Sequence, residues 1–248
     1  MPLCAPKPGL RARVLCHNAA TMTIYRVATF NIRHGKGADG VIDLGRVART
    51  MTATEADLIA LQEVDRGIER TGMVDQSQML AEITGLPIHF RSVLKRGGGR
   101  YGLALAGEGL SGLTYRELPR AGDEQARGVI GASWRGLSVL ATHLATQADI
   151  RPRQTSALAE MARRADRPVI VLGDLNQDAK DLSALRDAGL DPGPGSHSTF
   201  VHLWRRRQID YVLAGNGIEV VRSWTIPSDA SDHLPLVAEI HPVGPSRR

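Results

Sequence analysis

The chain has 248 residues, 42% of them hydrophobic, and a formal net charge of +5 at neutral pH. This composition is ordinary for a folded domain, and no apolar run approaches the roughly 18 residues that a transmembrane helix needs. The five net charges are carried by residues 1–22, which contribute three, and by Arg247 and Arg248. The body of the chain is therefore neutral, which excludes an overall field that would attract a polyanion such as nucleic acid.

Residues 1–22 are expected to be a disordered leader, because they contain several prolines and no apolar stretch of signal-peptide length. Cys4 and Cys16 both lie in this leader, so the body cannot hold a disulfide. We expect a cytoplasmic, monomeric protein with a single domain over residues 23–242, since no repeat or long linker divides it, and a basic tail over residues 243–248.

The first half of the body is expected to alternate strands with helices. Alternating apolar residues predict a strand at 24–30 that delivers Asn31 to a loop, and a strand at 57–62 that ends at Glu63. The remaining elements predicted here are a helix capped by Asp43, a helix at 74–84, an extended segment at 88–94, a mobile glycine turn at 97–99 and a short strand after Tyr101.

The second half is richer in strands. Four branched residues at 169–172 predict a strand buried on both faces, after which Gly173 is expected to let the chain turn. The other predicted elements are strands over 113–144 with a hairpin at 134–136, a helix with Pro152 in its first turn, a helix at 182–188, and strands at 209–214, 218–224 and 236–240. Because helices interrupt the strands without strict alternation, two packed sheets with helices outside are predicted.

Polar residues recur at or next to the predicted strand ends: Asn31, Glu63, His143, Asp174, Asn176, Asp210, Asp232 and His233. Each one alone is most simply a turn former, a helix cap or a surface histidine. Together they favour a site, because oxygen ligands such as Glu63, Asp232 and Asn31 suit Mg²⁺ or Mn²⁺. Zinc would require cysteines or clustered histidines, which the body lacks. Asp210 and His233 form a candidate dyad for proton transfer.

The chain resembles the endonuclease/exonuclease/phosphatase superfamily across about residues 24–241. The resemblance rests on motifs that occur in the order typical of the family: Thr29-Phe30-Asn31-Ile32, Leu61-Gln62-Glu63-Val64-Asp65, Tyr101-Gly102, Thr142-His143-Leu144, Gly173-Asp174-Leu175-Asn176, Gln208-Ile209-Asp210-Tyr211-Val212 and Ser231-Asp232-His233-Leu234-Pro235. It implies an α/β fold, a four-layer α/β sandwich of two packed, mainly antiparallel sheets flanked by helices.

The resemblance also implies a role for each residue in a metal-dependent, in-line attack of water on phosphorus. Glu63 would bind the metal with Asn31 and Asp232 beside it, and Asp174 would orient the water or help to hold the metal. The remaining roles are phosphoryl binding by Asn176, orientation of His233 by Asp210, phosphate contact and proton transfer by His143 and His233, and substrate contact by Tyr101. Substrate contact is also expected of Arg206 and Arg207, because these arginines directly precede the strand that bears Asp210 and can grip phosphates.

Two departures from the family pattern bear on mechanism and substrate. The glutamate that orients the first histidine in pancreatic-deoxyribonuclease-like members is missing before Tyr101, so the partner of His143 is unassigned. Val64 and Asp65 replace the Thr-Lys pair of the abasic-site branch, and this variant looks more like the bacterial phosphodiesterase, sphingomyelinase-like and phosphatase branches.

The favoured substrate is therefore a small or lipid-linked phosphate ester. A DNA or RNA nuclease is the first alternative, because the arginines at 205–207, Arg96 and Arg100 can grip phosphates, although the triplet can also be a solvated loop. The neutral body and an aromatic content of 4% argue against it, since few rings are available to stack bases. A non-catalytic phosphate-binding protein is the second alternative.

Overall fold

The computed structural model of the chain describes residues 13–15, 22–122, 124–202, 205–215 and 217–243. The strands are β1 (Arg13–Leu15), β2 (Met22–Asn31), β3 (Leu58–Arg66), β4 (Ile88–Arg96), β5 (Gly99–Ala106), β6 (Leu110–Glu117), β7 (Gly128–Trp134), β8 (Leu137–His143), β9 (Val169–Asp174), β10 (Phe200–His202), β11 (Arg205–Arg207), β12 (Asp210–Gly215), β13 (Ile218–Thr225) and β14 (Leu236–Pro242). The helices are α1 (Leu44–Ala53), α2 (Gln76–Thr84), α3 (Arg151–Arg163) and α4 (Ser183–Arg186), with short 3₁₀ turns at Arg33–Gly35, Glu69–Thr71 and Ala179–Asp181.

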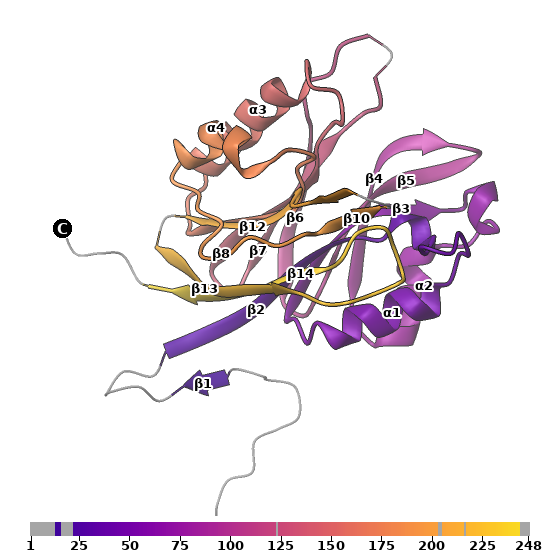
Figure 1. Cartoon of the computed structure of the whole chain (residues 1–248), viewed down its shortest axis with the longest axis horizontal. Coiled ribbons are helices and arrows are strands. Elements are labelled where there is room, and N and C mark those ends of the chain that lie inside the picture. Colours follow the sequence, from indigo (N-terminus) through magenta and orange to yellow (C-terminus); the bar gives the residue numbers. More distant parts are fainter. Residues whose placement is uncertain (1–12, 16–21, 123, 203–204, 216, 244–248) are drawn as a thin grey trace, which may run out of the picture.

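Two mixed sheets form the centre of the molecule (Figure 1). The main sheet has the strand order β13-β14-β2-β3-β5-β4, with β1 paired to β2, and the second sheet has the order β12-β9-β8-β7-β6. Among the strands of the described ranges, only β2 with β3 and β8 with β9 pair in parallel; the other pairs are antiparallel. Each parallel pair is joined through a helix, α1 in the first case and α3 in the second.

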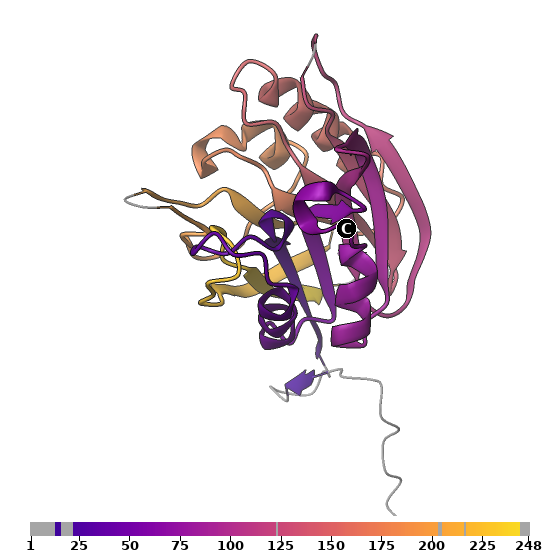
Figure 2. The same cartoon turned by 90° about the vertical axis from the view of Figure 1, so that its right-hand side faces the viewer.

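The predicted four-layer sandwich is confirmed. Helices α1 and α2 cover the outer face of the main sheet, and α3 and α4 cover the second sheet (Figures 1 and 2).

Strand β9 shows why a strand inside this sandwich has a continuous apolar run. Ile170 and Leu172 point into the core between the sheets, whereas Val169 and Val171 face the helices. The run is therefore buried on both faces, as its sequence predicts.

Three local predictions differ from the structure. Strand β3 does not end at Glu63 but continues to Arg66, and a register shift between Leu61 and Val64 accommodates the interruption. Gly173 does not turn the chain, since β9 continues through Asp174; instead, a Cβ at Gly173 would collide with the carbonyl oxygen of Thr142. The glycine run at 97–99 is only the short turn of the β4–β5 hairpin, with Gly99 already in β5.

The leader and the tail that the sequence predicts lie mostly outside the described residues. This holds for residues 1–12 and 16–21, which include Cys4 and Cys16, and for residues 244–248. Residues 13–15 form β1, which pairs with the start of β2. In the described part of the chain, no helix combines the length and the apolar character required to cross a membrane.

A buried carboxylate stabilises the edge of the main sheet. Glu239 on β14 is 4% exposed and accepts hydrogen bonds from Arg222 at 2.6 and 2.8 Å and from Arg26 at 3.0 Å. Both guanidinium groups lie over the ring of Trp224, at 4.9 and 5.1 Å. The hydrogen bonds from Arg222 are the main cause that lowers the pKa of Glu239 to about 2.

Glu239→Gln is expected to lower the free energy of unfolding at pH 7 by about 1 to 2 kcal/mol. Each unit of pKa shift corresponds to about 1.4 kcal/mol, but solvent screens part of the interaction because the side chain of Arg222 is 62% exposed. The folded-state pKa lies below the unfolded value, so this stabilisation is present above about pH 4.5 and is lost as the pH falls toward 2. Urea unfolding across this pH range measures the difference between wild type and variant. Glu219→Gln, at an exposed position of β13, is the control with an expected change below about 0.5 kcal/mol. A difference for Glu239→Gln that does not shrink with acidification would contradict this assignment.

Candidate active site

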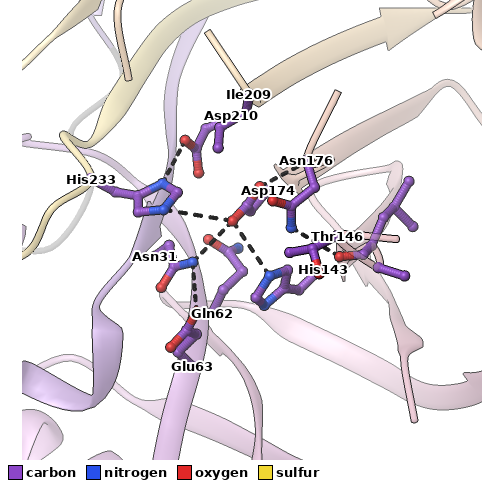
Figure 3. Close-up of polar contacts among 12 residues, drawn as sticks. Asn31, Gln62, Glu63, His143, Thr146, Asp174, Asn176, Ile209, Asp210 and His233 are labelled. Carbon is purple, nitrogen blue, oxygen red and sulfur yellow. Dashed lines mark hydrogen bonds and ion pairs between the residues drawn. The ribbon is translucent and has the colours of Figure 1, made fainter. Parts of the chain in front are cut away.

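Polar side chains from both sheets meet at one edge of the sandwich (Figure 3). Three of these residues lie at the ends of neighbouring strands of the second sheet: His143 on β8, Asp174 on β9 and Asp210 on β12. The strand register places His143 and Asp210 directly opposite Asp174, one on each side. Asn31, the last residue of β2, reaches across from the main sheet to the same carboxylate. The strand ends that the sequence singles out are thus brought together.

Asp174 is the centre of the cluster and is 1% exposed. Its Oδ2 accepts a hydrogen bond from Asn31 Nδ2 at 3.0 Å, and its Oδ1 accepts one from the backbone N–H of Asn176 at 2.9 Å. The Nε2 atoms of His143 and His233 lie 3.4 and 3.8 Å from Oδ2 (Figure 3). One carboxylate therefore connects residues from both sheets.

Asp210 and His233 form a buried hydrogen-bonded pair, with Oδ2 of the carboxylate 2.8 Å from Nδ1 of the ring. Burial alone would lower the pKa of His233, but the negative charge of Asp210 outweighs it and raises the pKa to about 10. Burial, and after it the charge of Asp210, raises the pKa of Asp174 to about 7. Asp210 thus favours the protonated form of the His233 imidazole, which lies beside Asp174, a carboxyl group that can exchange its proton near neutral pH.

Short contacts from neighbouring segments fix the positions of Asp210 and His233. Thr199 Oγ1 accepts hydrogen bonds from the backbone N–H groups of Ile209 and Asp210, both at 3.1 Å. The ring of Phe200 lies edge-on to the ring of His233, with centroids 5.1 Å apart. The imidazole is therefore held by a carboxylate on one side and an aromatic ring on another.

Glu63 occupies the irregular part of β3, where it adopts a φ of 59°. Its Oε1 accepts a hydrogen bond from Asn31 Nδ2 at 3.1 Å, and its Oε2 lies 3.9 Å from Nδ1 of His34. Burial would raise the pKa of Glu63, but the neighbouring His34, His143 and Asn31 outweigh burial and hold the pKa well below its usual range. The side chain remains 24% exposed, so a charged carboxylate is accessible at this position.

The hydroxyl group of Ser231 connects Asp232 to Asn31. Ser231 Oγ is 2.8 Å from the carbonyl oxygen of Asn31 and 3.4 Å from Oδ1 of Asp232. Oδ2 of Asp232 is 3.4 Å from Nε of Arg33, and its side chain is 16% exposed. The loop that carries Asp232 and His233 is thereby attached to the end of β2.

His143 and Tyr101 share an enclosed environment with Arg127. All three line a cavity of only about 10 Å³, roughly the minimum space for one water molecule. Burial, and after it the positive charge of Arg127, lowers the pKa of His143 well below its usual value, so the ring is neutral at pH 7. Tyr101 is 5% exposed, and burial together with the charge of Glu63 raises its pKa. The predicted substrate contact at Tyr101 is thus a buried side chain beside His143.

Asn176 and the two arginines predicted to contact substrate are placed differently from one another. The Asn176 side chain points back toward β8, where its Nδ2 donates a hydrogen bond to the carbonyl oxygen of Leu144 at 3.0 Å. Arg206 and Arg207 are exposed on β11, and Arg207 donates to Oδ1 of Asp178 at 3.0 and 3.1 Å. The segment is a strand paired with β10, and not the solvated loop that the sequence left open.

The β10–β11 hairpin lies beside the loop that carries the catalytic candidates. The backbone N–H of Val201 donates to the carbonyl oxygen of Asp232 at 2.8 Å, and Phe200 forms an isolated bridge with His233. Arg206 is opposite Val201 in the hairpin register. The exposed arginines therefore belong to a short flap that adjoins the cluster.

Comparison with known proteins identifies the family. A sequence model described as the Endonuclease/Exonuclease/phosphatase family matches residues 28–233, which is most of the chain. The chain belongs to this family. Members of the endonuclease/exonuclease/phosphatase family are hydrolases that act on phosphate esters. None of the curated proteins compared with the chain matches it.

Solved structures from the endonuclease/exonuclease/phosphatase family share the fold at low sequence identity. The endonuclease/exonuclease/phosphatase from Beutenbergia cavernae is 23% identical with a TM-score of 0.75, over 91% of this chain and 73% of that one. The one from Bacteroides vulgatus is 18% identical with a TM-score of 0.69, over 88% and 98%. The catalytic domain of human Nocturnin with a bound sulfate anion is 19% identical with a TM-score of 0.67, over 88% and 94%. These similarities establish the fold.

Members of the endonuclease/exonuclease/phosphatase family generally depend on a divalent metal, so the donor atoms of this chain can be tested for fit. In the described part of the chain, donor atoms of Asp174, Asp210 and His233 lie within 4.8 Å of one another. However, the imidazole is hydrogen-bonded to Asp210, and a protonated ring is not a metal ligand. Glu63 instead offers an accessible, charged carboxylate beside Asn31, and this oxygen chemistry fits Mg²⁺ or Mn²⁺.

Two residues at the cluster are missed by sequence reasoning. His34, which contacts Glu63, adopts a φ of 47° in a short 3₁₀ turn, and no local pattern predicts that orientation. Arg127 is 7% exposed, and its Nε is buried without a hydrogen-bond partner in the described part of the chain. The sequence does contain a signal for Arg127, because this charged residue directly precedes the buried strand β7 and charged residues are rarely buried without a partner.

Proposed function

We propose that the chain is a divalent-metal-dependent hydrolase of phosphate esters, a phosphodiesterase or phosphatase that uses in-line attack of water on a small or lipid-linked phosphate. The observation that carries the proposal is the buried Asp210–His233 pair, whose ring faces Asp174 at 3.8 Å. A structural ion pair would not require a second carboxylate at this position. A charged imidazole next to a proton-accepting carboxyl group is suited to phosphoryl chemistry.

The residues proposed to hold the metal are Glu63, with Asn31 and Asp232 beside it. Their support is the partly exposed Glu63 carboxylate and the link from Asn31 through Ser231 to Asp232. A bound Mg²⁺ or Mn²⁺ supplies positive charge that offsets the charge on the phosphoryl and leaving-group oxygens.

The proposed roles of the other residues follow from their protonation and contacts. Asp174 orients the attacking water and accepts its proton, for which a pKa of about 7 is suited. Protonated His233, held by Asp210, contacts a phosphoryl oxygen and stabilises its negative charge. Neutral His143 and the side-chain amide of Asn176 complete the proposed contacts to phosphate. Arg127, beside His143, provides further positive potential.

A nuclease that uses the same residues is the second candidate. The observation in its favour is the exposed Arg206 on the flap adjoining His233, which can contact a phosphate next to the one hydrolysed. The neutral body and the ion pair between Arg207 and Asp178 favour a small or lipid-linked ester instead.

The proposed reaction is tested by assaying bis-p-nitrophenyl phosphate and p-nitrophenyl phosphate with Mg²⁺, Mn²⁺ or EDTA. Turnover that requires metal and is abolished by EDTA is expected for at least one of the two esters, and their ratio separates diesterase from monoesterase activity. A panel of DNA, RNA, sphingomyelin, inositol phosphates and cyclic nucleotides then separates the substrate classes. Absence of metal-dependent turnover on all of these esters would leave a phosphate-binding protein.

A further inference from the structure

A second polar groove lies at the edge of the sandwich formed by β4 and β6, the terminal strands of the two sheets. It has a volume of about 810 Å³ and is lined by Arg66, Phe90, Arg91, Ser92, Arg100 and Tyr115. These residues come from β3, β4, β5 and β6. None of them belongs to the cluster around Asp174.

The groove carries positive charge that the described carboxylates do not balance. Arg100 on β5 is directly opposite Arg66 on β3, and both line the groove. Lys95 on β4 is also opposite Arg100, although it is not one of the lining residues. Arg66 pairs with Asp75 at 2.7 Å. For Arg91, Lys95 and Arg100, no carboxylate in the described ranges lies within ion-pairing distance. Like charges directly opposite each other destabilise a sheet, and a bound anion removes that repulsion.

Aromatic rings and close backbone contacts fix the walls of the groove. The guanidinium group of Arg91 lies over the ring of Tyr115 at 5.5 Å, and that of Arg66 lies over Phe90 at 5.9 Å. A Cβ at Gly128 would collide with the Tyr115 ring, so glycine is required for the ring to lie there. The arginines on two strands are therefore held in place by stacking, which lowers the entropy lost when they bind an anion.

We propose that this groove binds phosphate groups of a ligand, at a site separate from the phosphate that is hydrolysed. Planar guanidinium groups donate paired hydrogen bonds that match phosphate oxygens. Arg66 is three residues beyond Glu63 on β3, so the groove and the proposed metal ligand share one strand. A ligand that carries several phosphates can therefore extend from one site toward the other.

The stacking favours phosphates over nucleic-acid bases as the occupant. One face of the Phe90 ring and one face of the Tyr115 ring are covered by guanidinium groups and are not open to stack a base. A short polyphosphorylated molecule thus fits the groove better than a strand that is read through its bases. A small polyphosphorylated molecule and a nucleic-acid strand present the same phosphate groups, and binding experiments distinguish the two.

The test is calorimetric binding of inorganic tripolyphosphate to the full chain in EDTA, so that neither metal nor turnover is involved. Arg91→Gln combined with Arg100→Gln is expected to weaken tripolyphosphate binding at least tenfold. Arg153→Gln combined with Arg167→Gln is the control, because both positions are exposed, lie outside the groove and give the same change in net charge. The control is expected to change the dissociation constant less than twofold.

A second arm replaces tripolyphosphate with a single-stranded oligonucleotide. Tighter binding of the oligonucleotide, lost in the groove variant, supports the groove as a site for phosphates of a polymer; weaker binding supports a small ligand. Equal weakening in the groove variant and the control, or no weakening in either, would overturn the proposal. Because the readout is binding in EDTA, these outcomes do not depend on whether the chain hydrolyses phosphate esters.

Discussion

Glu63→Gln is expected to reduce metal-dependent turnover by at least about 100-fold while the chain stays folded. The substitution keeps the shape of the side chain and one oxygen that can accept from Asn31, but it removes the accessible negative charge beside that residue. A neutral amide is a much weaker ligand for a hard cation than a carboxylate. The metal concentration that gives half-maximal activity is therefore expected to rise together with the loss of rate.

The measurement for Glu63 is a titration of activity with Mg²⁺ and with Mn²⁺, accompanied by thermal unfolding. Glu69→Gln is a matched control, because Glu69 is an exposed carboxylate six residues further along the chain. Its activity and metal requirement are expected to equal those of the wild type. Unchanged activity in Glu63→Gln would remove Glu63 from the site.

Asp210→Asn is expected to lower kcat by about 10² to 10³-fold, the range typical for loss of a preorganised group that stabilises charge in the transition state. The carboxylate both orients His233 and raises its pKa, so the amide leaves the ring neutral over more of the pH range. The histidine is protonated below a pKa of about 10 in the wild type, and this limit is expected to move to lower pH in the variant. The hydrogen bonds from Ile209 and Asp210 to Thr199 use backbone N–H groups and are retained.

Two readouts separate a role in catalysis from a role in folding. Steady-state kinetics gives kcat, and NMR titration of the histidine ring gives the pKa of His233 independently of turnover. Asp187→Asn is the control, since it removes an exposed carboxylate directly after α4 that lies outside the cluster. A variant at Asp210 with a lowered pKa of His233 but full activity would exclude the pair from the reaction.

The strand ends of the site were predictable because the buried strands of this chain are continuous or alternating apolar runs. The run at 169–172 faces apolar cores on both sides, so its apolar pattern marks where β9 lies and that it ends near Asp174. The same applies to Asn31 at the end of β2. The family order of the motifs then indicated which strand ends meet, because pairing between distant strands is not encoded in any local pattern.

The parts that were not predictable depend on register and long-range contact. The irregularity at Glu63 arises from a shift in the pairing of β3 with β5, which a sequence read one strand at a time does not contain. The sequence predicts that Gly173 lets the chain turn. In the structure, glycine is needed there because a side chain would collide with the carbonyl oxygen of Thr142 on the neighbouring strand. Arg127 enters the site only because β7 lies beside β8 in the folded sheet.

The order of pairing in the main sheet determines when this site can exist during synthesis. β14, the last strand, pairs with β2, the first strand of the body, and the loop before β14 carries Asp232 and His233. The loop is fastened to β2 by the Ser231–Asn31 contact. A nascent chain still lacking these residues at the ribosome exit therefore has no imidazole between Asp210 and Asp174, so the site forms only after β14 has emerged.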